Sequence, residues 1–247
     1  MTRRCAWYRT KGQGDAPVAC RNREQVTRVT LRRTIAREPI ITPLPKERET
    51  ARIEAFSDGV FAIAMMLLVI EIKVPSHELV AATGLAQSLV ALWPSYLAYL
   101  TSFVTVLVIW VHHHWIFALV RRNDHPFLYW NGLLLLFVAF VPFPTALLAE
   151  YLLHPEARVA AHLYTGTFLA ISLAFDGLWR HASIRLLSKR ATIAKKDEAA
   201  QITKQYRFGP PLYFWVFGVS FVSEAWSVAL CLLLALFFAL RGWPARR

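Results

Sequence analysis

Three consecutive histidines, His112, His113 and His114, form the densest group of side chains that could bind a metal ion or transfer a proton. They lie in an apolar segment long enough to be a helix, where neighbouring side chains diverge by about 100° and three in a row cannot share a face. The spacing H-E-x-x-H, which places two zinc ligands on one face, does not occur. Structural hydrogen bonding, pH sensing and metal binding all remain open, and we expect the first, with no metal site.

A second group of polar side chains begins the apolar segment from about residue 53 to residue 72. Arg52, Glu54, Ser57 and Asp58 precede the string FAIAMMLLVI. Ionisable groups at membrane depth cost several kcal/mol unless they face protein or water, so other helices must surround this segment. A buried aspartate needs a positive or hydrogen-bond-donating partner, and the histidines at 112–114 are candidate partners for Asp58.

The same segment has one wholly aliphatic face. On a helix with 100° per residue, a single stripe contains Gly59, Ile63, Met66, Leu67 and Ile70. Asp58 points about 140° away from Ile63, so the polar start and the stripe face different surroundings. The residues alone indicate that the stripe contacts lipid or packs within a helical bundle.

The composition predicts that these segments belong to an integral membrane protein. Of the 247 residues 56% are hydrophobic, including 16 Phe and 9 Trp, and only 18% are charged, against about 25% in an average soluble domain. The three cysteines, Cys5, Cys20 and Cys231, are odd in number and lack metal-binding spacing. The cysteines therefore indicate neither a disulfide scaffold nor a zinc site, and the expected fold class is all-α.

Six apolar segments come near the roughly 20 residues that a helix needs to cross a bilayer. They run from about 53 to 72, 92 to 119, 127 to 153, 159 to 187, 209 to 222 and 225 to 240. Pro142 and Pro144 interrupt the third segment and should kink it. The last two segments are short and are separated only by Ser223 and Glu224, which predicts a tight helical hairpin.

The distribution of charge predicts the topology of these crossings. Residues 1–49 contain 12 basic and 5 acidic residues, residues 180–207 contain 8 and 2, and the tail from Arg241 adds three arginines. With Arg121 and Arg122, these basic regions all fall on one side if the chain crosses six times, and the remaining connections are neutral or acidic. Basic loops mark the cytoplasmic side, so both termini are expected in the cytoplasm.

Three regions follow from this reading. Residues 1–49 lack an apolar period and are rich in arginine, glycine and proline, which predicts a disordered basic cytoplasmic extension. Residues 50–240 form the transmembrane domain, with structure expected to begin near Glu49, and residues 241–247 form a basic cytoplasmic tail.

Three sets of residues resemble one known family. Arg52 followed by Phe56, Ser57 and Asp58, the spacing of Trp110, His113, His114 and Phe117, and Asn131 with the PFPT string at 142–145 are similar to motifs of the prokaryotic branch of the lysosomal potassium channel family, transmembrane protein 175. The resemblance covers roughly residues 49–240.

The resemblance implies a homotetrameric, potassium-preferring cation channel in the bilayer, expected in the bacterial inner membrane, with no cofactor and K⁺ as the permeant ion. Four copies of the first membrane helix would surround the pore, and rings of Ile63, Leu67 and Ile70 would constrict it, with Gly59 and Met66 beside them. Family members commonly have a threonine or serine at the position of Met66, so this chain lacks one hydroxyl that could contact ions. No T-V-G-Y-G filter string is present.

The remaining motif residues are expected to hold the first helix in place. Arg52, Ser57 and Asp58 would bind neighbouring helices, while Trp110 and Phe117 would pack in the same cluster as His113 and His114. Asp176 is expected to pair with Arg180 one helical turn away.

Two other classes of function remain to be compared with the channel. A secondary transporter would be expected to show inverted repeats or paired broken helices, and only the third segment is clearly interrupted. An enzyme would need a nucleophile with a base, or metal ligands on one face, and no such set is visible, so we expect no enzymatic activity.

Overall fold

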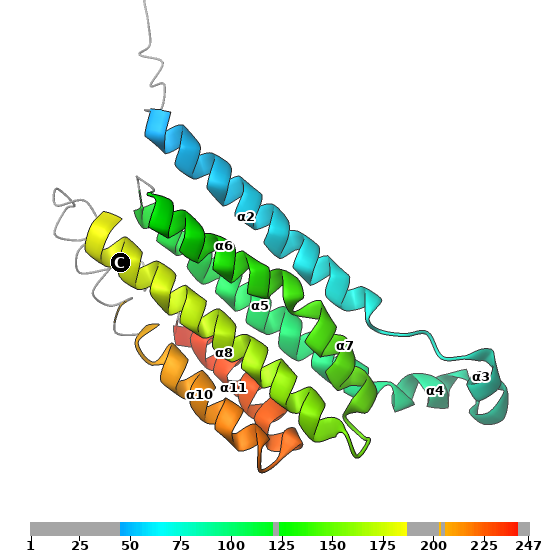
Figure 1. Cartoon of the computed structure of the whole chain (residues 1–247). Helices are drawn as coiled ribbons and strands as arrows, with labels where there is room; N and C mark the ends of the chain where they lie inside the picture. The colour runs from blue at the N-terminus through cyan, green and yellow to red at the C-terminus, as the bar shows by residue number, and fades with distance from the viewer. Residues whose placement is uncertain (1–44, 121–123, 187–202, 204–205, 242–247) are drawn as a thin grey trace, which may run out of the picture. The chain divides into compact units, whose positions relative to one another are not determined.

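The computed structural model describes residues 45–120, 124–186, 203 and 206–241, and in this part of the chain all regular structure is helical (Figure 1). The helices are α2 (Pro45–Ile70), α3 (His77–Thr83), α4 (Leu85–Ala91), α5 (Trp93–Leu119), α6 (His125–Phe140), α7 (Pro142–Tyr151), α8 (Ala157–His181), the π-helical η1 (Ala182–Leu186), α10 (Gly209–Ser220) and α11 (Glu224–Arg241). The predicted all-α class is confirmed. Residues 1–44 of the extension predicted at 1–49 and residues 242–247 of the tail predicted at 241–247 lie outside the described residues, while residues 45–49 and Arg241 are helical.

Four of the described stretches are long and apolar enough to cross a membrane, namely residues 50–70, 93–119, 125–151 and 157–184. The predicted fifth and sixth segments are present as α10 and α11, with 12 and 18 residues. At 1.5 Å per residue these helices are about 18 and 27 Å long, shorter than a hydrocarbon core of about 30 Å. The count of six crossings therefore stays a prediction.

Local sequence explains the boundaries of the two helices that meet at the candidate site. α2 begins at Pro45, earlier than the apolar segment, because residues 46–52 (KERETAR) are mostly good helix formers that need no membrane. α6 ends at Phe140, and α7 begins at Pro142 with proline in its first turn. The prolines therefore break the third apolar segment as predicted.

Two ion pairs lie at opposite ends of the helices. Lys73, just after α2, binds Glu150 of α7 at 2.7 Å, and the hydrogen bond and charge of Glu150 raise the pKa of Lys73. Asp124, just before α6, binds His181 at the end of α8 at 2.8 Å. The same carboxylate accepts a hydrogen bond from the Phe127 main-chain nitrogen and caps α6. α2 and α7 therefore end on the same side, whereas the start of α6 lies beside the end of α8, as in antiparallel neighbours.

The core is formed by the long helices. α2 packs on α5, α6 and α7, while α8 packs on α6, α7, α10 and α11, and α11 also contacts α5 (Figure 1). The buried side chains at the centre include Phe61, Phe127, Leu134, Tyr164 and Phe168. α2 thus has helices on one side only among the described residues.

Close approach of α6 to α8 depends on Gly177. A β-carbon at this position would lie 2.5 to 2.7 Å from three atoms of the Trp130 ring. We expect Gly177→Ala to lower the stability of the folded protein by about 1 to 3 kcal/mol, because the indole must move out of its packed position. Thermal unfolding in detergent measures this change. Gly218→Ala is the matched control, since no atom lies within 4 Å of its β-carbon position; equal melting temperatures for the two variants would contradict the prediction.

Candidate functional site

The buried face of α2 attaches this helix to the rest of the subunit. Ser57, Phe61, Ala64 and Leu68 are at most 1% exposed and follow one another at intervals of four, three and four residues. This spacing places them on one face of a helix. They pack towards α5, α6 and α7, so the rotation of α2 about its own axis is fixed within the subunit.

The opposite face of α2 is the aliphatic stripe predicted from the sequence. Ile63 is 60% exposed, Met66 70%, Leu67 41% and Ile70 70%. Gly59 is exposed, and no atom lies within 4 Å of the position that its β-carbon would take. The described residues of the same chain leave much of each of these side chains uncovered, so lipid or other copies of the chain must cover them in a membrane.

A buried chain of hydrogen bonds joins α2, α6 and α5. Asn131 of α6 donates from Nδ2 to Ser57 Oγ at 3.0 Å, and Ser57 donates to the Ile53 carbonyl. His113 Nε2 lies 2.8 Å from Asn131 Oδ1. Because an amide oxygen can only accept, Nε2 of His113 carries the hydrogen. All three side chains are at most 3% exposed.

Aromatic rings surround this chain of hydrogen bonds. The His113 ring lies 5.2 Å from Phe61 of α2 and 4.5 Å from Phe117 of its own helix, and Phe117 lies 5.2 Å from Phe127 of α6. These rings exclude water from the polar groups, so each hydrogen bond is costly to break.

Two further polar contacts hold α2 against α5. Trp110 Nε1 donates to Asp58 Oδ1 at 2.9 Å, and His114 Nδ1 lies 2.9 Å from Glu54 Oε1. The suggested histidine partner for Asp58 is therefore wrong: the donor is the indole nitrogen of Trp110. The reason is geometric: His113 faces α6, and His114 lies beside Glu54, which is one turn before Asp58 on α2.

The three consecutive histidines point to three different partners, as their spacing predicts. His113 meets Asn131, His114 meets Glu54, and His112 Nδ1 lies 3.0 Å from the Tyr206 hydroxyl. Within the described ranges no three His, Cys, Asp or Glu side chains lie close enough to hold a metal ion.

Two motif residues lie apart from this network. Arg52 and Phe56 are exposed, Phe56 by 66%, and line a groove between α2 and α6 together with Asp124 and His125. Arg52 is therefore not buried between helices in the subunit, in contrast to Ser57.

At the edge of this groove, Asp124 is held in its charged form. Burial by itself would raise the pKa of Asp124, but hydrogen bonds from His181 and the Phe127 main chain, with the charge of His181, lower it overall. A depressed carboxyl pKa stabilises the folded state above the ordinary pKa, and this contribution is lost as pH falls through the lowered value.

The expected pair between Asp176 and Arg180 is present, with 2.7 Å between Oδ2 and Nε. The central role of Asn131 and the partner role of Glu54 were not predicted. Glu54 lies three residues before Ser57 and four before Asp58, on the same side of the helix, and this spacing is a signal that could have included Glu54.

For the ion-conducting oligomer that the resemblance implies, we expect Asp58→Ala to reduce assembly and thermal stability more than it changes ion preference. The variant leaves Trp110 Nε1 without its acceptor, which costs about 1 to 3 kcal/mol when the group is buried. Asp58→Asn keeps an oxygen at the same place and should behave nearly as the wild type. Size-exclusion chromatography after heating, and ion flux in liposomes, measure the two properties. Normal assembly of Asp58→Ala with altered ion preference would assign Asp58 to the ion path instead.

The fold and this site define a class: an α-helical membrane protein with several long apolar helices, in which α2 is fixed by buried hydrogen bonds and leaves an aliphatic stripe uncovered. The model of the family described as endosomal/lysosomal potassium channel TMEM175 matches residues 52–142. A potassium channel of Chamaesiphon minutus is 62% identical over 200 residues, covering 80% of this chain and 97% of the relative. The chain belongs to the TMEM175 family.

Two further relatives agree. A potassium channel of Streptomyces collinus is 42% identical over 200 residues, covering 79% of this chain and 94% of its own. The crystal structure of a lysosomal potassium-selective channel TMEM175 homolog from Chamaesiphon minutus matches with a TM-score of 0.73 and 60% identity, covering 80% of this chain and 100% of that chain. The predicted family, the membrane location and the absence of an enzyme class are therefore confirmed.

Proposed function

We propose that the chain forms a homotetrameric channel that conducts K⁺ passively, with four copies of α2 around a central pore. The observation that carries this proposal is the uncovered stripe on α2, which contains no charged residue between Gly59 and Ile70. The names of the bacterial relatives as potassium channels support the choice of ion.

In the proposed pore, Ile63, Leu67 and Ile70 form three constricting rings. They are separated by about 6 and 4.5 Å along the helix axis. An ion passing such rings loses water that no side chain replaces, and an apolar constriction can also close by dewetting. Potassium holds its water less tightly than sodium and therefore loses less. With Met66 beside the first ring and no hydroxyl there, we expect the preference for K⁺ to be modest.

The polar contacts of α2 give this pore a rigid wall. Ser57, Asp58 and Glu54 bind α6 and α5 from the side opposite the stripe. These residues act on conduction by fixing the rotation of α2 and do not contact the ion.

We extend the same proposal to the topology of the chain. Both termini lie in the cytoplasm, α10 and α11 are the last two crossings of a bacterial inner membrane, and residues 1–49 form a cytoplasmic extension.

Reconstitution into liposomes with a K⁺ gradient tests the function, with no cofactor added. A channel gives K⁺ flux that needs no second ion and stays far from saturation as the gradient rises. The competing reading is a secondary transporter, which the break between α6 and α7 would allow. Flux that saturates at carrier rates, or that requires a coupled ion, would overturn the channel proposal.

A further inference from the structure

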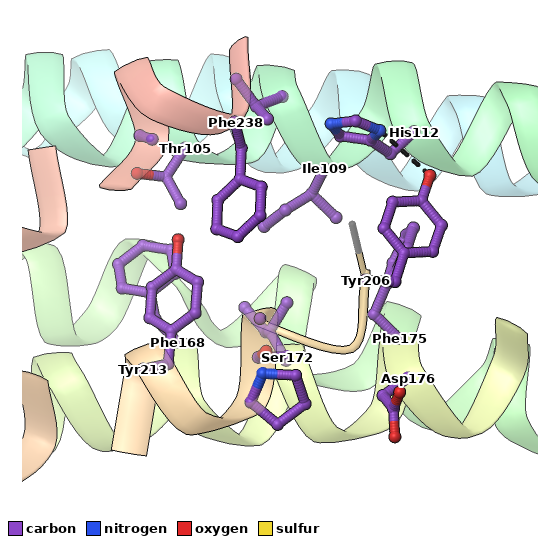
Figure 2. Close-up of a pocket in the computed structure, with 15 residues that line it drawn as sticks. Thr105, Ile109, His112, Phe168, Ser172, Phe175, Asp176, Tyr206, Tyr213 and Phe238 are labelled. Atoms are coloured by element: carbon purple, nitrogen blue, oxygen red, sulfur yellow. Dashed lines mark hydrogen bonds between the residues drawn. The ribbon is translucent and has the colours of Figure 1, made fainter. Parts of the chain in front are cut away.

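A cavity lies in the half of the subunit that is away from α2. It has a volume of about 70 Å³ and lies among α5, α8, α10 and α11, together with Tyr206 (Figure 2). α2 contributes no lining residue, so this cavity is separate from the stripe proposed to line the pore.

The wall of the cavity is almost entirely hydrocarbon. Its apolar part comes from Ile109 of α5, Phe168, Ile171 and Phe175 of α8, and Ala235 and Phe238 of α11. Figure 2 shows the ring of Phe238 between Thr105 and Ile109 and the Tyr206–His112 hydrogen bond nearby. A wall of this kind is poorly suited to water, which needs two to four polar partners.

Several polar groups at the wall are already bonded to protein. The Tyr206 hydroxyl and His112 Nδ1 bind each other, and Thr105 donates to the Thr101 carbonyl at 2.7 Å. Asp176 is paired with Arg180. A ligand that bonded to these groups would have to break their pairs, whereas an apolar ligand leaves them intact.

The position of the cavity along α5 points to the source of such a ligand. Thr105 and His112 are 14 and 7 residues before Leu119, the last residue of α5, which places them about 21 and 10 Å from that end of the helix. α5 is one of the four candidate membrane spans. The cavity therefore lies at the depth of acyl chains, and the half-buried Ile109, Phe175 and Pro210 show that it is not fully closed.

We infer that this cavity binds the end of a saturated alkyl chain, supplied by a lipid of the surrounding bilayer. An engineered apolar cavity of about 150 Å³ holds a benzene ring, so a cavity of about 70 Å³ suits a chain end of about two or three carbons and not a whole lipid. Binding is favourable because the chain end fills the void and makes dispersion contacts with the aromatic rings that an empty cavity lacks. This inference requires the membrane location but not ion conduction.

Photolabelling of the full-length protein in liposomes tests it. The first probe is a phospholipid with a diazirine near the end of one acyl chain, and the second is a long-chain alcohol with the same group. Mass spectrometry of peptides should locate label on Ile109 and Phe175 as well as on the exposed Leu233 and Leu236 of α11. An excess of unlabelled alkane should abolish the label at the cavity and leave the label on the exposed residues. Cavity label from the alcohol alone would support an alkyl site while overturning the bilayer lipid as its source.

Two variants fill the cavity from two different helices. Ala235→Leu adds three carbons from α11, and Thr105→Ile replaces the hydroxyl by a larger apolar group from α5. Each should lose the cavity label while the exposed label stays. Ala239→Leu is the matched control, because Ala239 lies one turn further on α11 and is exposed. The inference would be overturned if the wild type showed no label at the cavity, if that label did not saturate, or if it persisted in both filled variants.

Discussion

Replacing Ile63 with Asn lowers the permeability of the channel to K⁺ relative to Na⁺ until the two are nearly equal. In the proposed tetramer this change puts four amide groups at the first ring. Their oxygens replace part of the water that an ion loses, and this relief is larger for sodium, which is the more strongly hydrated ion. Reversal potentials with K⁺ on one side of the membrane and Na⁺ on the other measure the ratio directly.

The same substitution at Val69 is the matched control. Val69 is 52% exposed in the single chain, close to the 60% of Ile63, but points about 120° away from it on the helix. We expect Val69→Asn to leave the permeability ratio unchanged. Equal ratios in wild type and Ile63→Asn would place the constriction elsewhere, and a change in both variants would show that the effect is not specific to the stripe.

Replacing Asn131 with Leu produces the largest loss of stability that we expect from a single side chain in the α2 site. The variant removes the acceptor of His113 Nε2 and the donor to Ser57, both of which are buried. Each buried group left without a partner costs about 1 to 3 kcal/mol. The attachment of α2 to α6 is weakened at the same time, so the proposed tetramers should dissociate at lower temperature. Size-exclusion chromatography after heating steps measures this shift.

A second substitution separates the lost hydrogen bonds from simple misfit of leucine. His113→Phe in the Asn131→Leu background removes the buried N–H and keeps a ring beside Phe61 and Phe117. Replacing both partners of a buried hydrogen bond by apolar groups can be nearly neutral, so the double variant should recover part of the stability. A single variant as stable as the wild type would show that the chain of hydrogen bonds contributes little.

The apolar helices were predictable because length and hydrophobicity are local properties. α5, expected at 92–119, runs from Trp93 to Leu119. The start of α2 was placed too late, since residues 46–52 are polar and hydropathy does not detect a helix that continues outside the bilayer. The lengths of α10 and α11 also follow from local sequence, but whether they cross depends on bilayer thickness and on neighbouring helices.

The contacts between helices were less predictable than the helices themselves. Ser57 and Asn131 are 74 residues apart, and their contact depends on how α2 and α6 are rotated when they pack. Periodicity gives the face of one helix but not the residue opposite it. For this reason the stripe was found from spacing alone, whereas the donor to Asp58 was assigned to a histidine and proved to be Trp110.

The divergence of His112, His113 and His114 makes α5 unusually intolerant of a change in length. Their partners are Tyr206, Asn131 of α6 and Glu54 of α2. Deleting one residue between Thr105 and His112 would turn the rest of α5 by about 100° and shift it by about 1.5 Å, so all three pairs would be lost together. Alanine at any one of the three histidines removes a single pair. Single-residue deletions should therefore abolish expression throughout this part of α5, whereas such point substitutions are only partly harmful.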